Sequence, residues 1–294
     1  MVSQSYEARQ KHVSSATYLD HSAMILFPSF FLSLETPMVR PFVAAFMLGL
    51  VLCTPARAMN FAFTANSTIN GTVLPSQLTM SGSIVPGDFD RFTMLLKERP
   101  MEMWFALKDV RLSSPGGDVR EAMLLAALLR QLYVHTQAQG DCASACFVLW
   151  MSGSWRWWRN GRIGVHRPSF QSEYFKSLPV DVAQQKYSEL STAYRTFLLD
   201  QGLPQSIYEK LMSMSSEEIY WLTESELLLI GGFPPYYDEL LRAACPSPDT
   251  DEKRTAMRKC DAKLSLKMKA KGFDAVLKSA HDPWWDRARI TFLQ

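Results

Sequence analysis

From about residue 60 onward, the spacing of apolar positions switches repeatedly between the period of a strand and that of a helix. Residues 60–85 alternate short β-prone runs with Gly, Asn, Ser and Pro, which predicts two or three strands. In the following PGDFDRFTMLLKERP, apolar side chains recur at helical spacing and a proline ends the segment. The strand-like MWFALKDVRLSS and LYVHTQA then flank a helix-like PGGDVREAMLLAALLRQ. Such alternation favours an α/β fold in which crossover helices connect a mostly parallel sheet.

The second half of the chain continues with one more strand and then becomes helical. GRIGVHRPSF has the pattern of a strand leaving a Gly turn, and residues 179–201 that of a long helix. In WLTESELLLIGG, Thr223 and Glu226 form the pattern of a capping box, and the Gly pair ends the helix. Residues 234–294 are predicted to be a charged helical extension. Its basic stretch, residues 251–271, is ordinarily interpreted as a solvated helix face, and a docking surface for an acidic partner is the alternative.

The N-terminal region carries an export-like pattern that does not begin at residue 1. A positive charge follows Met38, residues 42–52 are apolar, and the motif ARA ends at Ala58. This is the three-part layout of a secretory signal, with cleavage after Ala58. We therefore predict a signal peptide over 38–58 and regard residues 1–37 as a start-site artefact or disordered segment. The apolar stretch is short for a membrane span, so a membrane-anchoring helix is the less favoured alternative.

Composition and charge narrow the class of protein. The 294 residues are 47% hydrophobic and 12% aromatic, as in a globular protein. Lys and Arg number 31 against 29 Asp and Glu, a balance that argues against nucleic-acid binding. The signal pattern indicates a periplasmic or secreted protein, with a domain over 59–233 followed by the helical extension.

Four cysteines follow the signal pattern, and an oxidising compartment permits disulfides between them. Cys245 and Cys260 are the preferred pair because they bracket the turn-rich PSPDTDEK. Cys142 and Cys146 are a second candidate pair, since a helix beginning there would place them one turn apart. Two buried free thiols are the alternative for that second pair.

The stretch GDCASACFVLW places Ser144 between two cysteines at the start of an apolar run. A serine at a helix start is usually an N-cap, and it becomes a nucleophile only if a base accepts its proton. His166 ends the strand-like GRIGVHRP and is the candidate base. The turn SSPGG, with Gly116 and Gly117, could present backbone N–H groups to a ligand, although Pro-Gly-Gly is also an ordinary tight turn.

In this order, LSSPGGDVREAMLLAALLR, GDCASACFVLWMSG and GRIGVHRP resemble the Clp-type (ClpP-like) serine peptidases of the crotonase-like superfamily. They are similar above all to exported bacterial relatives with a Cys-x-Ser-x-Cys element. The resemblance covers about residues 104–233 and implies a ClpP-like fold. It implies Ser144 as nucleophile and His166 as general base. It also implies that the N–H groups of Gly117 and Ala145 form the oxyanion hole.

The third member of the triad is where this sequence departs from the family pattern. The family has an acidic residue shortly before its last helix, and Ser215 lies nearest that slot here, with Glu217 and Glu218 as neighbours. A serine could orient the imidazole but could not offset its positive charge. Three alternatives follow: a nearby glutamate takes the place of the missing acidic residue, the site works as a Ser–His dyad with a weaker base, or the protein has lost catalytic activity. Each of these remains open at this point.

Substrate contacts are predicted at Gly116 and at Trp155 and Trp157 in SGSWRWWRNGR. These tryptophans could line a hydrophobic substrate groove or face a membrane surface, and a hairpin with stacked Arg and Trp is the structural alternative. No cofactor or metal is expected.

Together these features favour an exported serine hydrolase acting on a peptide or protein substrate, compatible with a homo-oligomer and with membrane-surface association. A catalytically inactive binding module on the same scaffold is the main alternative. An acyl-CoA enzyme suits the fold but not export, and a Ser–Lys mechanism would use Lys108 or Lys176.

Overall fold

The computed structural model describes residues 58–69, 71–169, 175–278, 285–286 and 288. All of them belong to one compact unit that spans residues 53–294, so the domain predicted over 59–233 and the helical extension fall in the same unit. The segment 1–37 and all but the last residue of the predicted signal peptide lie outside the described residues.

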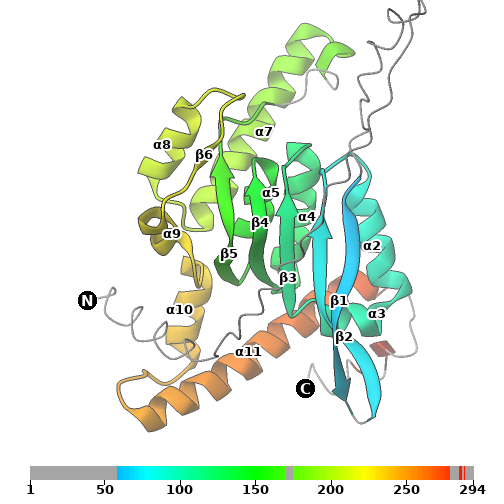
Figure 1. The fold of residues 1–294 in the computed structure, drawn as a ribbon, viewed down its shortest axis with the longest axis vertical. Helices are drawn as coiled ribbons and strands as arrows, with labels where there is room; N and C mark the ends of the chain where they lie inside the picture. Colours follow the sequence, from blue (N-terminus) through cyan, green and yellow to red (C-terminus); the bar gives the residue numbers. More distant parts are fainter. Residues whose placement is uncertain (1–57, 70, 170–174, 279–284, 287, 289–294) are drawn as a thin grey trace, which may run out of the picture. The chain divides into compact units, whose positions relative to one another are not determined.

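A six-stranded sheet forms the centre of this unit, and its strand order follows the chain (Figure 1). The strands are β1 (Asn60–Ile69), β2 (Thr72–Ser81), β3 (Asp109–Ser114), β4 (His135–Ala143), β5 (Trp155–Val165) and β6 (Tyr220–Trp221). Strands β2 to β5 pair in parallel, whereas β1 and β6 pair antiparallel at the two edges. The α/β class predicted from the alternation of patterns is therefore confirmed.

Helices connect the parallel strands and extend beyond them. They are α2 (Asp88–Glu98), α3 (Pro100–Ala106), α4 (Val119–Gln131), α5 (Ala145–Met151), α7 (Val180–Asp200), α8 (Gln205–Ser213), α9 (Glu224–Ile230), α10 (Pro235–Ala244) and α11 (Asp251–Leu277). Figure 1 shows α4 and α5 behind the central strands, on the same face of the sheet. Because β3, β4 and β5 are parallel, the connections β3–α4–β4–α5–β5 place their carboxyl ends at the same end of the sheet.

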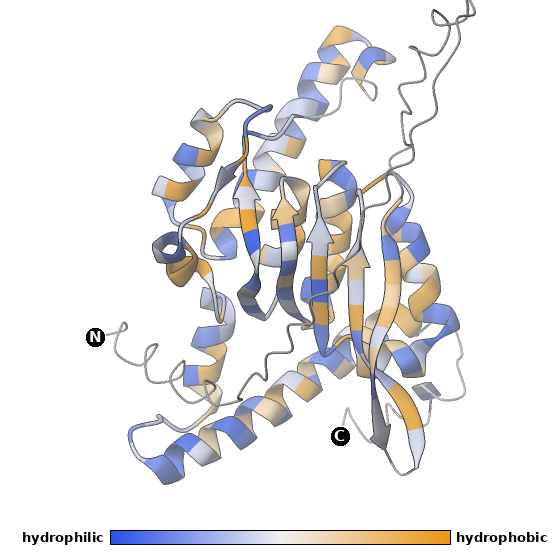
Figure 2. Ribbon diagram, viewed as in Figure 1, coloured by the Kyte–Doolittle hydropathy of each residue, from blue (hydrophilic) through white to orange (hydrophobic). Residues whose placement is uncertain are grey.

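The central strand β3 has one buried face, which follows from the alternation of its side chains. In β3, Val110, Leu112 and Ser114 are buried, whereas Asp109, Arg111 and the residue between Leu112 and Ser114 are partly exposed. Figure 2 shows the corresponding alternation of hydrophobic and hydrophilic positions along this strand. The connecting helices α4 and α5 cover the apolar face of the central strands, and this packing holds the ends of those strands in place.

Two local expectations are resolved at the level of single elements. The capping box predicted at Thr223 and Glu226 is present, with each side chain accepting from the other residue's backbone N–H. The segment MWFALKDVRLSS is not a single strand, because α3 occupies its first part and β3 begins only at Asp109. Pro100 starts α3, and the buried Met103, Trp104 and Ala106 give it an inward face.

The C-terminal extension packs on the rest of the unit. The rings of Trp104 in α3 and Phe273 in α11 are 4.9 Å apart in an edge-to-face arrangement. The buried Nζ of Lys269 donates a hydrogen bond to the carbonyl oxygen of Trp104 at 2.5 Å. Burial lowers the pKa of Lys269 to about 7, from an ordinary value of 10.5.

Candidate active site

Ser144 lies in the corner between β4 and α5, with backbone angles φ 56° and ψ −125°. Among the described residues other than glycine, only Tyr133 and Ser144 have positive φ. Such a conformation costs free energy for any residue with a Cβ and is typical of the sharp strand-to-helix turn that exposes a nucleophile. The Ser144 side chain makes no capping hydrogen bond. The ordinary reason for a serine at this position is therefore lacking.

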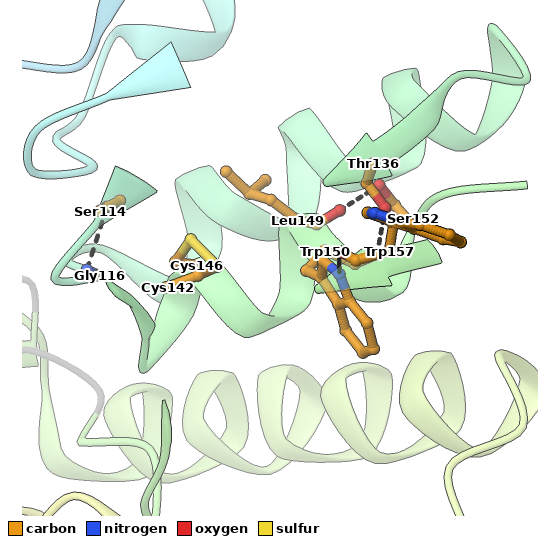
Figure 3. Close-up of a disulfide and its surroundings, with 9 residues drawn as sticks. All are labelled: Ser114, Gly116, Thr136, Cys142, Cys146, Leu149, Trp150, Ser152 and Trp157. Atoms are coloured by element: carbon orange, nitrogen blue, oxygen red, sulfur yellow. Dashed lines mark hydrogen bonds between the residues drawn. A yellow bond between two sulfur atoms is a disulfide. The ribbon is translucent and has the colours of Figure 1, made fainter. Parts of the chain in front are cut away.

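Helix α5 is held firmly behind this corner. All seven of its residues are buried. The hydroxyl of Thr136 in β4 donates to the carbonyl oxygen of Trp150 at 2.7 Å. The Trp150 indole Nε1 donates to the carbonyl oxygen of Trp157 in β5 at 2.9 Å (Figure 3). The start of α5, and with it Ala145, is consequently fixed relative to both strands.

Gly116 lies directly against Ser144 because the end of β3 runs beside the end of β4, and the next residue, Gly117, lies against Ile84. A Cβ on Gly116 would lie 2.6 Å from the Ser144 Cβ and 2.9 Å from the Ala145 nitrogen. A Cβ on Gly117 would lie 2.0 Å from the carbonyl oxygen of Ile84, and both glycines have positive φ. Only glycine fits at either position.

Two backbone N–H groups are left over at this junction. The N–H of Gly116 donates to Ser114 Oγ at 3.1 Å, and the N–H of Ser144 donates to the Gly164 carbonyl oxygen at 2.9 Å. Within the described residues, no acceptor is assigned to the N–H groups of Gly117 and Ala145. The structure thus brings together the predicted residues Gly116, Ser144 and Ala145, and Gly117 follows Gly116 directly in the chain.

His166 follows the last residue of β5, which is the neighbour of β4 in the sheet. Ala143 is paired with Gly164, and the Ser144 N–H bonds to Gly164, so the serine and the histidine leave adjacent strands at the same edge. The His166 side chain is partly exposed. Among the described residues it has no hydrogen bond to Ser144.

The Nδ1 atom of the His166 imidazole contacts the main chain. His166 Nδ1 is 2.8 Å from the carbonyl oxygen of Arg167. A carbonyl oxygen only accepts, so Nδ1 carries the proton in this contact, and in the neutral ring Nε2 is left with its lone pair. The Arg167 carbonyl therefore selects the tautomer that a general base needs. A main-chain contact of this kind leaves no signal in the sequence.

The end of β5 is anchored by the short strand β6 and by α9. Tyr220 is paired with Val165, and its hydroxyl donates to Glu226 at 3.0 Å. Lys210 forms a 3.0 Å ion pair with the same carboxylate. Burial tends to raise the pKa of Glu226, but hydrogen bonds from the Thr223 backbone and from neighbouring side chains outweigh it and lower the pKa to about 2. This ionised carboxylate fixes the strand that precedes His166.

Both expected cysteine pairs are joined. Cys142 and Cys146 have Cα atoms 5.2 Å apart, and Cys245 and Cys260 have Cα atoms 5.7 Å apart. The geometry of the first pair differs from the expectation of two adjacent helical turns, because β4 continues to Ala143. The Cys142–Cys146 bond, drawn in Figure 3, therefore joins a strand to a helix, and Ser144 lies between the two cysteines in the chain.

Ser215, expected near the third catalytic position, is used locally. Its exposed hydroxyl oxygen accepts from the backbone N–H groups of Glu217 and Glu218 at 3.1 and 3.2 Å. Within the described residues it forms no hydrogen bond with His166, and both glutamate side chains are exposed. The structure does not bring this serine to the imidazole.

Trp155 and Trp157 lie at the beginning of β5, ten and eight residues before Val165. At about 3.3 Å per residue, this places them roughly 26–33 Å from the strand end that carries His166. Trp155 packs edge-to-face on Phe233, with ring centroids 4.5 Å apart. Their position does not support a role in lining a groove at Ser144, because a strand this long separates its two ends.

Two hollows in the described surface are lined by helices other than α5. One of about 380 Å³ is lined by α4 and α11, and another of about 640 Å³ by α4 and α7. Neither is lined by Ser144 or His166. Among the described residues, no cluster of three or more His, Cys, Asp or Glu side chains could hold a metal ion. No helix in the described part of the chain is long and apolar enough to cross a membrane.

Comparisons with known proteins give matches to solved structures only. No family model and no curated protein matches the chain. ClpP1 from Listeria monocytogenes is similar at 13% identity with a TM-score of 0.36, covering 51% of this chain and 84% of that chain. A variant of the same ClpP1 is similar at 14% identity with a TM-score of 0.34, covering 49% of this chain and 80% of that chain.

Proposed function

We propose that this protein is an exported serine hydrolase that cleaves peptide or protein substrates through Ser144 and His166. The observation that carries the proposal is the backbone of Ser144. The residue is held at φ 56° without serving as a cap, beside an unbonded N–H group and one strand from a histidine. Export is supported by the two disulfides, which persist in oxidising compartments, and by the pattern before Ala58.

In the proposed reaction, the Oγ of Ser144 attacks the substrate carbonyl carbon while Nε2 of His166 takes the hydroxyl proton. The carbonyl π electrons move to the oxygen, and the N–H groups of Gly117 and Ala145 stabilise that oxyanion. Collapse of the intermediate expels the amine, which receives the proton from His166. Water then attacks the acyl-enzyme with His166 again as base, which releases the acid and restores Ser144.

A fluorophosphonate probe tests this assignment, because it bonds covalently to an activated serine with loss of fluoride. Wild type should be labelled, Ser144→Ala should not, and His166→Ala should be labelled far more slowly. Ser67→Ala, which changes an exposed serine on β1, is the matched control and should label like wild type. Equal labelling of Ser144→Ala and wild type would remove Ser144 as the nucleophile.

A catalytically silent binding module on the same scaffold is the second candidate. It is favoured by the contact of His166 with a neutral carbonyl and by the local use of Ser215. A folded sample that resists the probe but binds peptides, with binding abolished by Gly117→Ala, would support this function over hydrolysis.

A further inference from the structure

A disulfide encloses the proposed nucleophile. Cys142 is the penultimate residue of β4, Cys146 is the second residue of α5, and Ser144 lies midway between them. Both cysteines are completely buried, with 0% of their surface exposed. Figure 3 shows this bond on the side of the corner where the Ser114–Gly116 turn lies, consistent with the pairing of Ser114 with Cys142.

The position of this bond is poorly suited to general stabilisation. A disulfide restricts the unfolded chain more when it closes a longer loop. Cys142 and Cys146 are 4 residues apart, whereas Cys245 and Cys260 are 15 apart. The shorter link therefore contributes less to global stability, and its main effect is on the few backbone angles it encloses.

The backbone angles enclosed by the Cys142–Cys146 disulfide include the strained φ and ψ of Ser144. Relaxing Ser144 from φ 56° to an ordinary region would change the direction in which α5 leaves β4, and thus separate Cys146 from Cys142. Two hydrogen bonds also act on the corner, from the Ser144 N–H to Gly164 and from the Phe147 N–H to the Ser144 carbonyl, each 2.9 Å long. Hydrogen bonds can open transiently, whereas the covalent link cannot.

We propose that the Cys142–Cys146 disulfide is a positioning element that keeps the Ser144 hydroxyl and the Ala145 N–H in reactive geometry. The inference rests on the proposed function of Ser144. Neither sulfur touches the substrate, because both are buried beneath the corner. The bond acts as a permanent brace formed during folding, since a buried disulfide is shielded from thiol reductants in the native protein.

The test compares two cysteine pairs removed by the same chemistry. Cys142→Ala with Cys146→Ala should lower the maximal rate of fluorophosphonate labelling by ~10–100-fold, because a small displacement of a nucleophile has effects of that size. The concentration of probe giving half-maximal rate should change by less than about twofold, since uniform binding is not what the brace provides. Cys245→Ala with Cys260→Ala should label like wild type although it opens the longer loop.

A repacked pair, Cys142→Val with Cys146→Ala, replaces lost volume in case the alanine pair does not fold, and should show the same loss of maximal rate. Wild-type labelling should also survive incubation of the native protein with a thiol reductant. Unchanged maximal rates in the folded alanine or valine variants would overturn the brace and leave the hydrolase assignment standing. Failure of wild type itself to label would instead remove the hydrolase assignment, and the brace with it.

Discussion

Replacing Ser144 with glycine should make the folded protein more stable. The residue occupies φ 56° and ψ −125°, where a Cβ crowds the backbone, and its side chain makes no capping hydrogen bond that the substitution would remove. Most substitutions of a partly buried residue destabilise a protein. A gain at this position would show that the chain retains a strained side chain that folding itself disfavours.

The magnitude follows from two opposing contributions. A non-glycine residue in a sparsely populated backbone region costs about 1–3 kcal/mol. Glycine loses about 0.5–1 kcal/mol more conformational entropy on folding than a residue with a Cβ. Ser144→Gly should therefore raise the free energy of unfolding by about 0.5–2 kcal/mol. For a chain of this size each kcal/mol corresponds to an increase in Tm of about 2–4 °C.

Denaturant unfolding at neutral pH, with both disulfides intact, measures this difference. Ser144→Ala is the matched control, because it removes the hydroxyl but keeps the Cβ, and it should stay within about 0.5 kcal/mol of wild type. Both variants should be inactive toward the probe, so the comparison separates stability from reactivity. A Ser144→Gly variant less stable than Ser144→Ala would refute the claim that the backbone at this corner is strained.

Gly116→Ala would place a Cβ 2.6 Å from that of Ser144, so we expect both a lower Tm and loss of probe labelling, measured on the same sample. Because burial lowers the pKa of Lys269 to about 7, the unfolded chain holds more protons than the folded one between pH 7 and 10.5, and wild-type stability should rise with pH across this window relative to Lys269→Met. The free energy of unfolding of wild type, measured relative to that of Lys269→Met, should rise by up to about 1.4 kcal/mol per pH unit, and Lys267→Met, at an exposed lysine of the same helix, is the control variant. The pKa of Glu226, about 2 against an ordinary 4.5, means that its stabilisation is present above pH 4.5 and lost as pH falls toward 2. Glu226→Gln should therefore be less stable than wild type at neutral pH, by up to about 3 kcal/mol, and the difference should vanish in an acid titration of unfolding.

Much of the architecture could be predicted from the sequence because local rules and tertiary structure agree. Apolar periodicity located α2, α4 and α7, and the capping box at Thr223 marked the start of α9. The segment containing α3 was wrongly predicted to be a strand, because a short run of apolar residues does not by itself distinguish a strand from a helix. The start of that helix is fixed by Pro100, which the sequence pattern had indicated only as the end of the preceding helix.

The site was harder to predict where it depends on distance along a strand. The tryptophans of SGSWRWWRNGR are close in sequence to His166, but β5 begins at Trp155 and is 11 residues long, so Trp155 and Trp157 lie near the opposite end of this strand from His166. Ser144 and Gly116, by contrast, are far apart in sequence but lie side by side because β3 and β4 are parallel neighbours. Proximity along the chain is therefore a poor guide to which side chains share a site, whereas the parallel order of the strands places the carboxyl ends of β3, β4 and β5 at the same end of the sheet.

The contact between His166 and the Arg167 carbonyl bears on how strong a base this site can have. In serine peptidases the third group fixes the imidazole tautomer and stabilises the imidazolium that forms. The Arg167 carbonyl, 2.8 Å from Nδ1, can fix the tautomer, but it can stabilise the imidazolium only with its dipole and not with a full negative charge. Loss of the correct tautomer accounts for about 10⁴-fold in the best-studied triad, and that loss is avoided here. The expected enzyme is therefore slower than one with a carboxylate, yet well above an unassisted serine, and its labelling by a fluorophosphonate should be slow and dependent on His166. Among the described residues no carboxylate is hydrogen-bonded to the imidazole, so under the proposed function we expect the first proton transfer, from Ser144 to His166, to limit the rate.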